Sequence, residues 1–257
     1  MYDRFEVKDD KLRSIARYVY EWYDKRRIEY GDLEEILLDE LKVDTVDGRF
    51  EVVMLAILFS EWAMREERAY NLWKRTTTWL RSNNLSYYDV FSGENKEALK
   101  GLIILLEEIN APSRFLSKMS KTAKKLRRYG GDLNGLVDED DWAGTVSKIK
   151  GCRIGVSQKA FWVARVMRQK GAWMVPGEFC CVSDSHNKAF LKKTGFIVND
   201  NNLFANSRVM WKYFNEPFKR QYYDLSPFRF ARHHGCKNCH EACCNLEKMK
   251  LCELKRR

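Results

Sequence analysis

Apolar residues recur at helical spacing along most of this chain. Between residues 10 and 24, for example, Leu12, Ile15 and Val19 fall on one side of a helix. The stretch from Phe50 to Met64 is apolar nearly all round, which predicts a buried central helix. The pattern predicts helices over residues 10–24, 32–42, 50–64, 66–82, 95–109, 113–128, 156–169, 185–193, 203–214 and 219–223.

The sequence shows no sign of long β-strands, internal repeats or low-complexity linkers. Residues 171–183 look extended or looped, but no long stretch alternates apolar and polar side chains as a half-buried strand does. We find no internal repeat and no low-complexity linker. Proline is scarce, with 4 residues, and tryptophan is abundant, with 8. We therefore expect an all-α fold.

Composition narrows the class of protein. The chain has 257 residues, of which 32% are charged and 45% hydrophobic, a globular profile whose length suits one large domain or two small ones. The net charge of +10 favours a polyanionic partner. No apolar run approaches the roughly 20 residues of a membrane span, and the first residues contain no apolar signal region. We expect a soluble intracellular protein, in the cytoplasm or nucleoid, with no membrane partner.

Part of the positive charge gathers in one predicted helix. The segment 113–128 contains seven Lys or Arg residues and no acidic residue. Its spacing puts five of them on one face and leaves apolar side chains, such as Phe115, Met119 and Leu126, for another face. This face is either an ordinary solvated surface or a stripe that contacts phosphates. Its residues are Arg114, Lys118, Lys121, Lys125 and Arg128.

Two charged residues stand at predicted helix starts. Lys159 falls in the first turn of its helix, where the helix dipole disfavours a further positive charge and so favours a neutral, nucleophilic amine. Asp184 precedes a helix that Gly195 ends, which is the pattern of an N-cap and a residue just past the C-cap. Each residue could also have a purely structural role: Lys159 could be an ordinary exposed surface residue, and Asp184 could serve only as an N-cap.

The eight cysteines are unevenly distributed. Cys152, Cys180 and Cys181 lie in the middle of the chain, and we assign them no role. The other five crowd into the C-terminal end, interspersed with histidines. Without a secretory signal, such a cluster indicates metal or iron–sulfur ligation rather than disulfides. The cluster consists of Cys236, Cys239, Cys243, Cys244 and Cys252, with His233, His234 and His240 nearby.

Around Lys159 and Asp184 the sequence resembles the helix–hairpin–helix DNA glycosylases of the endonuclease III type. Arg153 to Ala160 (RIGVSQKA) is similar to the family hairpin Leu-Pro-Gly-Val-Gly-Arg-Lys-Thr, aligned without gaps, and Lys159 falls on the catalytic lysine. Val182 to His186 resembles the Val-Asp-Thr-His stretch that contains the catalytic aspartate. Phe50 to Ser60 resembles the helix that begins the family core. With the cysteine cluster, these motifs follow the family order over roughly residues 50–252.

The resemblance implies a bifunctional DNA glycosylase and lyase of base excision repair, expected to act as a monomer on double-stranded DNA that contains a damaged base. Lys159 is implied as the nucleophile and Asp184 as the catalytic carboxylate. In the family, a residue at the position of Trp62 fills the gap that the flipped base leaves, and Glu61 is a weaker candidate for this role. Trp62 could equally be an ordinary core residue. The implied DNA contacts are Gly155, Ser157, Gln158, Lys118, Lys121, Lys125 and Arg128.

The sequence also departs from the family. Ser157 replaces the second hairpin glycine, Arg153 and Ile154 replace Leu-Pro, and the separation of 25 residues between Lys159 and Asp184 is longer than in endonuclease III. Archaeal 8-oxoguanine glycosylases have a longer connection there. We therefore favour 8-oxoguanine slightly over an oxidised pyrimidine as the excised base.

The resemblance implies a 4Fe–4S cluster for the C-terminal cysteines, in the spacing C-x2-C-x4-C-x7-C. A structural zinc ion is the alternative, because histidines lie among the cysteines. Either would hold a C-terminal loop whose basic residues can face DNA. The implied ligands are Cys236, Cys239, Cys244 and Cys252, with Cys243 as a substitute for Cys244.

The expected architecture is two helical lobes. Residues 48–185 would form a lobe with the hairpin and Lys159, and residues 1–47 with 186–257 would form the second lobe, which includes the cysteine loop at 236–252. The catalytic site would lie in the cleft between them. Two other functions remain open, a non-catalytic nucleic-acid-binding protein of the same fold and a related enzyme that acts on modified nucleosides.

Overall fold

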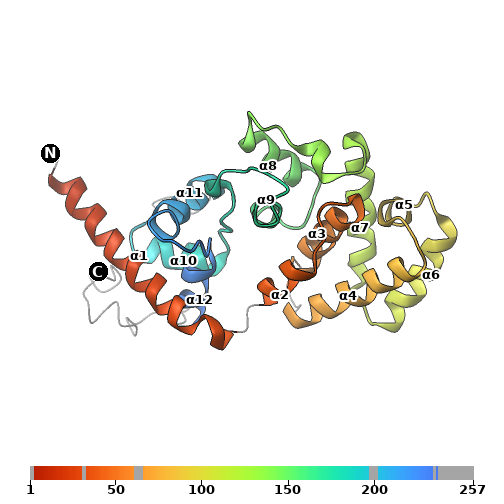
Figure 1. Cartoon of the computed structure of the whole chain (residues 1–257), viewed down its shortest axis with the longest axis horizontal. Coiled ribbons are helices and arrows are strands. Elements are labelled where there is room, and N and C mark those ends of the chain that lie inside the picture. Colours follow the sequence, from red (N-terminus) through yellow and green to blue (C-terminus); the bar gives the residue numbers. More distant parts are fainter. Residues whose placement is uncertain (1–2, 31–32, 61–65, 197–201, 234–235, 237–257) are drawn as a thin grey trace. The chain divides into compact units, whose positions relative to one another are not determined.

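The computed structural model describes residues 3–30, 33–60, 66–196, 202–233 and 236 (Figure 1). Every regular element among these residues is a helix, and no strand occurs in them. The expectation of an all-α fold is therefore confirmed for the described chain.

The chain divides into two compact units. The terminal unit consists of Met1–Asp32 and Pro176–Arg257, and the central unit of Leu33–Val175. These limits differ from the boundaries at 48 and 185 that the sequence suggested. Helix α2 (Leu33–Glu40) packs on α4 (Glu66–Ser82), and the 3-10 helix η3 (Gly177–Phe179) packs on α11 (Leu203–Phe214). Asp184 consequently belongs to the terminal unit and not to the unit of Lys159.

The central unit is built around α3 (Val46–Leu58), whose residues from Gly48 to Leu58 are all buried. The predicted central helix is thus present, although it starts earlier and ends at Leu58 instead of continuing to Met64. Helix α3 packs against α4, α5, α7 and α9. The remaining elements of this unit are α5 (Tyr87–Ser92), α6 (Lys96–Glu108), α7 (Ser113–Leu126), η1 (Arg127–Tyr129), η2 (Leu133–Leu136), α8 (Trp142–Gly151) and α9 (Lys159–Gln169).

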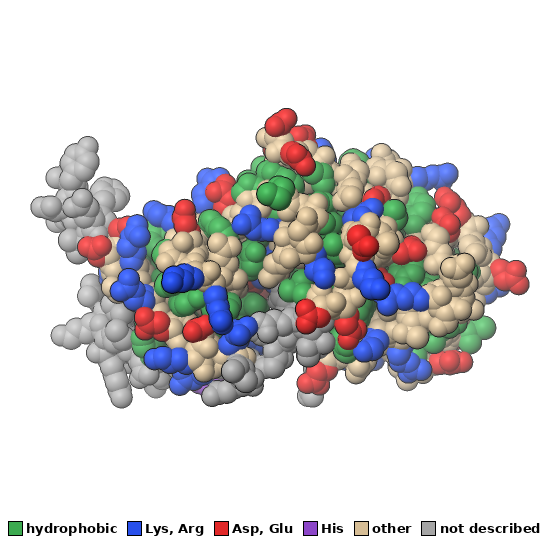
Figure 2. Space-filling model, viewed as in Figure 1, with side chains coloured by type: hydrophobic (Ala, Val, Ile, Leu, Met, Phe, Trp, Pro, Cys, Tyr) green, Lys and Arg blue, Asp and Glu red, His purple; other side chains and the backbone are tan. Residues whose placement is uncertain are grey.

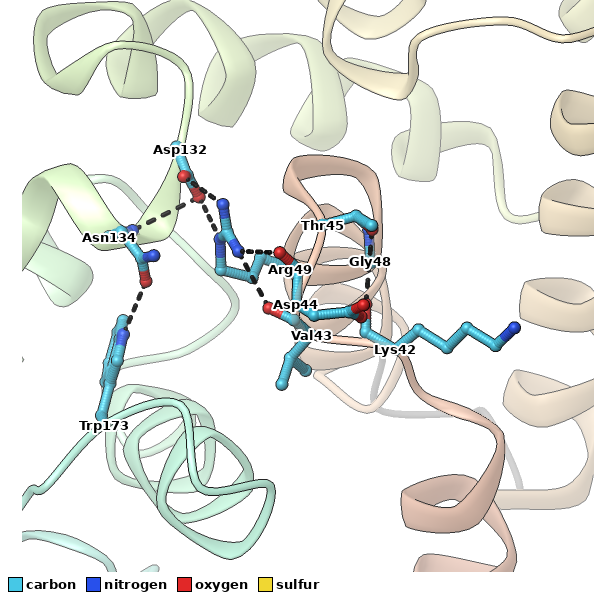
Figure 3. A network of polar contacts seen from close by, with 9 residues as sticks. All are labelled: Lys42, Val43, Asp44, Thr45, Gly48, Arg49, Asp132, Asn134 and Trp173. Atoms are coloured by element: carbon cyan, nitrogen blue, oxygen red, sulfur yellow. Dashed lines mark hydrogen bonds and ion pairs between the residues drawn. The ribbon is translucent and has the colours of Figure 1, made fainter.

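A buried arginine ties α3 to two loops of the central unit (Figure 3). The Arg49 guanidinium donates two hydrogen bonds to the Asp132 carboxylate, at 2.7 and 2.6 Å, and two more to the carbonyls of Val43 and Asp44. Beyond Asp132, the Asn134 side chain accepts a 2.8 Å hydrogen bond from the indole N–H of Trp173. Four charge-assisted bonds satisfy the guanidinium, which allows it to be buried.

The terminal unit has an aromatic core. Helix α1 (Asp3–Tyr30) packs against α11 and α12 (Leu225–His233), and α10 (Ser185–Lys193) packs against α12. Phe230 lies at the centre, with ring centroids 5.2 Å from Trp22 and 5.7 Å from Phe190. Phe190 in turn meets Phe214 at 6.0 Å. The rings meet at steep angles, the edge-to-face arrangement that aromatic pairs favour.

The agreement between predicted and observed helices varies along the chain. Helices α4 and α11 coincide with the predicted ranges 66–82 and 203–214. The prediction at 219–223 is wrong, because Tyr223 has a φ of 54° and its amide donates to the Asn215 side chain, which forms a turn. The sequence did not predict α5, α8 or α12.

Candidate active site

Lys159 follows a tight loop that joins two packed helices of the central unit. Helices α8 and α9 pack together, and residues 152–158 connect them as the α8–α9 loop. Arg153 and Gly155 in this loop have φ values of 60° and 70°, in the left-handed region. Ser157, which stands at the position of the second family glycine, does not have a positive φ. The serine therefore fits this loop without the backbone strain that a positive φ would cause.

Gly155 brings the loop against the end of α3. A Cβ atom at this position would lie 2.4 Å from Ser60 Oγ and 2.6 Å from the Ala56 carbonyl oxygen. The Ser60 hydroxyl accepts a 3.0 Å hydrogen bond from the Val156 amide and donates one to the Ala56 carbonyl. Only glycine combines the required φ with so close an approach. Nothing in the sequence pattern identified Ser60 as the residue that fixes this loop.

The same end of α3 also positions Lys159. As predicted, Lys159 is at the start of its helix, where its amide donates to the Val156 carbonyl at 2.7 Å. Its ammonium nitrogen lies 5.5 Å from the centre of the Phe59 ring, a cation–π contact. Phe59 meets the buried Trp162 edge to face at 5.6 Å. The Lys159 side chain, itself half-buried, is thus held over an aromatic pair.

The basic face of α7 adjoins the α8–α9 loop. Thr122 donates a 3.2 Å hydrogen bond to the Arg153 carbonyl, and the Lys125 ammonium donates one of 2.6 Å to the Gly151 carbonyl. Burial raises the pKa of the Cys152 thiol, and the positive charges of Lys125 and Arg128 oppose that shift. The structure therefore brings this loop and the basic stripe together in one unit. The stripe consists of Arg114, Lys118, Lys121, Lys125 and Arg128.

The stripe faces outward, as its spacing predicted. Arg114, Lys121 and Arg128 are exposed, whereas Lys118 and Lys125 are half-buried. The predicted inward residues Phe115, Met119 and Leu126 are buried. Figure 2 shows Lys and Arg side chains interspersed with Asp and Glu on one face of the molecule.

Asp184 is the N-cap of α10. Its carboxylate accepts a 2.8 Å hydrogen bond from the Asn187 amide, and Gly195 follows the helix with a φ of 80°, as predicted. Burial raises the pKa of the Asp184 carboxyl, and repulsion from Asp224 adds to that rise. The Asn187 amide and the His186 charge act in the opposite direction.

Several side chains that the sequence did not single out hold the segment before Asp184. Asp224 accepts a 2.8 Å hydrogen bond from the Val182 amide, and Ser207 accepts one of 3.0 Å from the Cys181 amide. The Asn206 side-chain amide donates to the Ser183 hydroxyl at 2.9 Å. These partners come from α11 and from the turn before α12. No short motif could reveal them, because they are distant in sequence.

Most of the predicted metal ligands lie outside the described residues, namely Cys239, Cys243, Cys244 and Cys252. The two candidates for filling the gap in the duplex, Glu61 and Trp62, also lie outside them. Cys236 is described and buried, and its amide donates to the Ala231 carbonyl at the end of α12. Within the described ranges, no group of three or more His, Cys, Asp or Glu side chains is suited to hold a metal ion.

Cys152, Cys180 and Cys181 are buried, and none of the three forms a disulfide bond. Cys152 is the first residue of the α8–α9 loop, and Cys180 and Cys181 lie shortly before Asp184 in the sequence. The Cys180 thiol donates a 3.6 Å hydrogen bond to the Pro176 carbonyl, and the Cys181 sulfur accepts one of 3.8 Å from the Asn215 side chain.

Comparisons with known proteins found no relative of this chain. No family model, no curated protein and no solved structure matches this chain. Among the described helices, none is long and apolar enough to cross a membrane.

Proposed function

We propose that this protein is a bifunctional DNA glycosylase and lyase that excises a damaged base from double-stranded DNA. The observation that carries the proposal is the arrangement around Lys159. A lysine begins a helix directly after a tight loop, and that loop is hydrogen-bonded to a helix with an exposed basic face. A nucleophile beside a phosphate-binding surface is what this reaction requires.

The DNA backbone would be held by the basic stripe and by the start of α9. Exposed Lys and Arg side chains neutralise phosphates and supply affinity without choosing a sequence. A helix N-terminus also favours an anion. Gly155, Ser157 and Gln158 lie in the α8–α9 loop, within reach of the same stretch of backbone as the helix start. The damaged nucleotide would leave the base stack, because its C1′ atom cannot be reached inside a duplex.

The proposed chemistry uses Lys159 and Asp184. The Lys159 ammonium gives up a proton to a general base, the part that the family resemblance gives to Asp184, and the neutral amine attacks C1′ of the flipped nucleotide. A bond forms between Nζ and C1′ while the C1′–N bond to the base breaks, and the departing base takes up the proton that Nζ loses after forming the new bond. The sugar ring then opens to a Schiff base. Loss of a C2′ proton breaks the C3′–O bond, which cuts the strand 3′ to the lesion.

Borohydride trapping tests this function. The protein is incubated with duplexes that each contain one lesion, 8-oxoguanine, an oxidised pyrimidine or an abasic site, and the reaction is reduced. We expect a covalent protein–DNA adduct with the abasic duplex and with at least one damaged base, 8-oxoguanine being slightly favoured. An undamaged duplex should give none. Absence of an adduct on every lesion would refute the proposal.

Duplex binding should depend steeply on salt through the basic stripe. Replacing Arg114, Lys121 and Arg128 together by glutamine should reduce the slope of log affinity against log salt by up to about 3, since each lost phosphate contact removes about 0.9. Binding is measured by fluorescence anisotropy on an undamaged duplex. The control replaces Arg75, Lys96 and Lys100, which are exposed on α4 and α6, by glutamine. If the slope fell equally in the control variant, the phosphate contacts would not be confined to the basic stripe.

We also propose that the C-terminal cysteines hold a 4Fe–4S cluster. Of the implied ligands, Cys236 is described: it is buried and lies three positions after the end of α12, a setting that suits a cluster ligand. Such a cluster would fix the end of the chain and take no part in the excision step. Protein purified without oxygen should be brown and contain about four irons per chain. A colourless protein with about one zinc per chain would favour the zinc alternative.

A non-catalytic nucleic-acid-binding protein is the second candidate. The contact between α7 and the α8–α9 loop lies entirely within the central unit and needs neither the Lys159 amine nor Asp184. Such a protein would bind duplexes with the same salt dependence and would form no adduct. Trapping therefore separates the two functions.

A further inference from the structure

A cavity of about 400 Å³ lies beside the start of α3. The start of α3, the end of α4 and residues 84–87 line it, and its volume is in the range of small-molecule sites. Glu51, on its wall, precedes Leu58 at the end of α3 by seven positions, about 10 Å along the helix. The α8–α9 loop is bonded to Ser60, beyond that other end. The cavity is therefore separate from the loop that precedes Lys159.

A buried carboxylate with one unpartnered oxygen lines this cavity. Glu51 is 1% exposed, and its Oε1 atom accepts hydrogen bonds from the Arg81 guanidinium at 2.6 Å and from the Tyr87 hydroxyl at 3.0 Å. Its Oε2 atom has no hydrogen-bond partner among the described residues. Because buried polar atoms are rarely left without a partner, Glu51 indicates a donor or acceptor that the described chain does not supply.

A neutral hydroxyl group suits this oxygen best. Arg81 already pairs with the Glu51 charge, so a second cation would leave a positive charge without a partner. Burial raises the pKa of the Glu51 carboxyl, and the hydrogen bond from Arg81 opposes that rise. A hydroxyl fits both protonation states, because it can donate to a carboxylate and accept from a carboxyl, whereas an N–H group can only donate.

The start of α3 adds features that favour an anion. The first amides of the helix, those of Val46 and Asp47, have no acceptor within it, and such a helix start attracts a phosphate. The exposed Lys42, which also lines the cavity, forms no ion pair with a described residue, and Figure 3 shows its side chain extended away from the Arg49 network. The Asp47 carboxylate adds a negative charge beside it. This balance favours a ligand with one phosphate over a ligand with two.

We propose that this cavity binds a monophosphorylated sugar, with the phosphate at the start of α3 beside Lys42 and a sugar hydroxyl on Glu51 Oε2. Glu51 lies six positions beyond the N-cap Thr45, about 9 Å along the helix, so the two contacts suit opposite ends of one small molecule. Free sugar phosphates and nucleoside monophosphates both have this chemistry. The inference goes beyond the proposed excision and does not depend on it, because no residue of the cavity takes part in that reaction.

Calorimetric titrations with ribose 5-phosphate and with inorganic phosphate test the two contacts separately. The wild type should bind ribose 5-phosphate at least about tenfold more tightly than inorganic phosphate, because the hydroxyl adds a hydrogen bond to a charged group. Glu51→Met, which keeps the side-chain volume and removes both oxygens, should abolish that advantage and leave the affinity for inorganic phosphate unchanged. Lys42→Gln should weaken both ligands by a similar factor.

Lys100→Gln is the matched control for charge. Lys100 is exposed on α6 and does not line the cavity, so its loss should leave both affinities unchanged. If the wild type bound the two ligands equally, Glu51 would hold no hydroxyl and the inference would be overturned. An equal loss in Lys42→Gln and Lys100→Gln would overturn the placement of the phosphate.

NMR of the wild-type protein covers the case in which Glu51→Met does not fold. Ribose 5-phosphate should shift the amide signals of Gly48 and Tyr87, which line the cavity, in a saturable way and leave the Lys159 amide in place. No shift at Gly48 and Tyr87 would overturn the inference. Adenosine monophosphate distinguishes the sources: tighter binding than ribose 5-phosphate supports a nucleotide, and weaker binding supports a free sugar phosphate. Failure of borohydride trapping would refute excision and leave this site unaffected.

Discussion

Replacing Lys159 by alanine is expected to abolish the covalent adduct with lesion duplexes and the strand cut that follows it. Without the amine, no bond to C1′ can form and no Schiff base exists to be reduced. We expect adduct formation to fall by at least about a thousandfold. The rate is measured as the yield of cross-linked protein per minute on an abasic duplex. Alanine suits the first turn of α9, so the variant should fold normally.

Lys150→Ala provides the control for charge. Lys150 is exposed in the last turn of α8, close to the same loop, and its removal changes the net charge by the same amount. This variant should bind duplexes slightly less tightly and retain adduct formation. An adduct that survives in Lys159→Ala would show that another amine is the nucleophile. If adduct formation fell equally in Lys159→Ala and Lys150→Ala, Lys159 would contribute only its charge.

Local signals in the sequence were sufficient for some of the helices and their ends. The uniform burial of α3 follows from its continuous apolar run. Helix α10 begins directly after its N-cap Asp184 and ends before Gly195, because capping depends on neighbouring residues. The outward face of α7 likewise follows from spacing alone. By contrast, α8 and α12 were missed. Pro227 falls in the first turn of α12, a position where a helix tolerates proline but where a sequence pattern suggests a break.

Long-range partners could not be predicted in the same way. Ser60 fixes the α8–α9 loop from 96 residues away, and Asp224 reaches Val182 across 42 residues. Such contacts depend on how helices pack, and nothing at Ser60 or Asp224 distinguishes them from other polar residues. The unit boundaries were missed for the same reason. Residues 33–47 belong with the central unit through the packing of α2 on α4, a tertiary contact without a composition signal.

Replacing Arg49 by methionine is expected to destabilise the central unit by about 3–5 kcal/mol. Methionine fills much of the volume but leaves the Asp132 carboxylate without its two charge-assisted bonds, and the carbonyls of Val43 and Asp44 without a donor. Both side chains of the pair are largely buried, at 9% and 18% exposed, so water replaces these bonds poorly. The thermal midpoint should fall by roughly 10 °C. Urea unfolding measures the free energy directly.

Two further variants decide whether the loss comes from an uncompensated buried charge. Arg127→Met breaks a surface pair with Glu94, at 3.9 Å and 77% and 47% exposed, and should cost less than about 1 kcal/mol. The double variant Arg49→Met/Asp132→Asn removes the stranded charge and should recover a measurable part of the loss, although the two carbonyls stay unsatisfied. If the double variant were less stable than Arg49→Met, the cost would come from lost packing and hydrogen bonds rather than from Asp132.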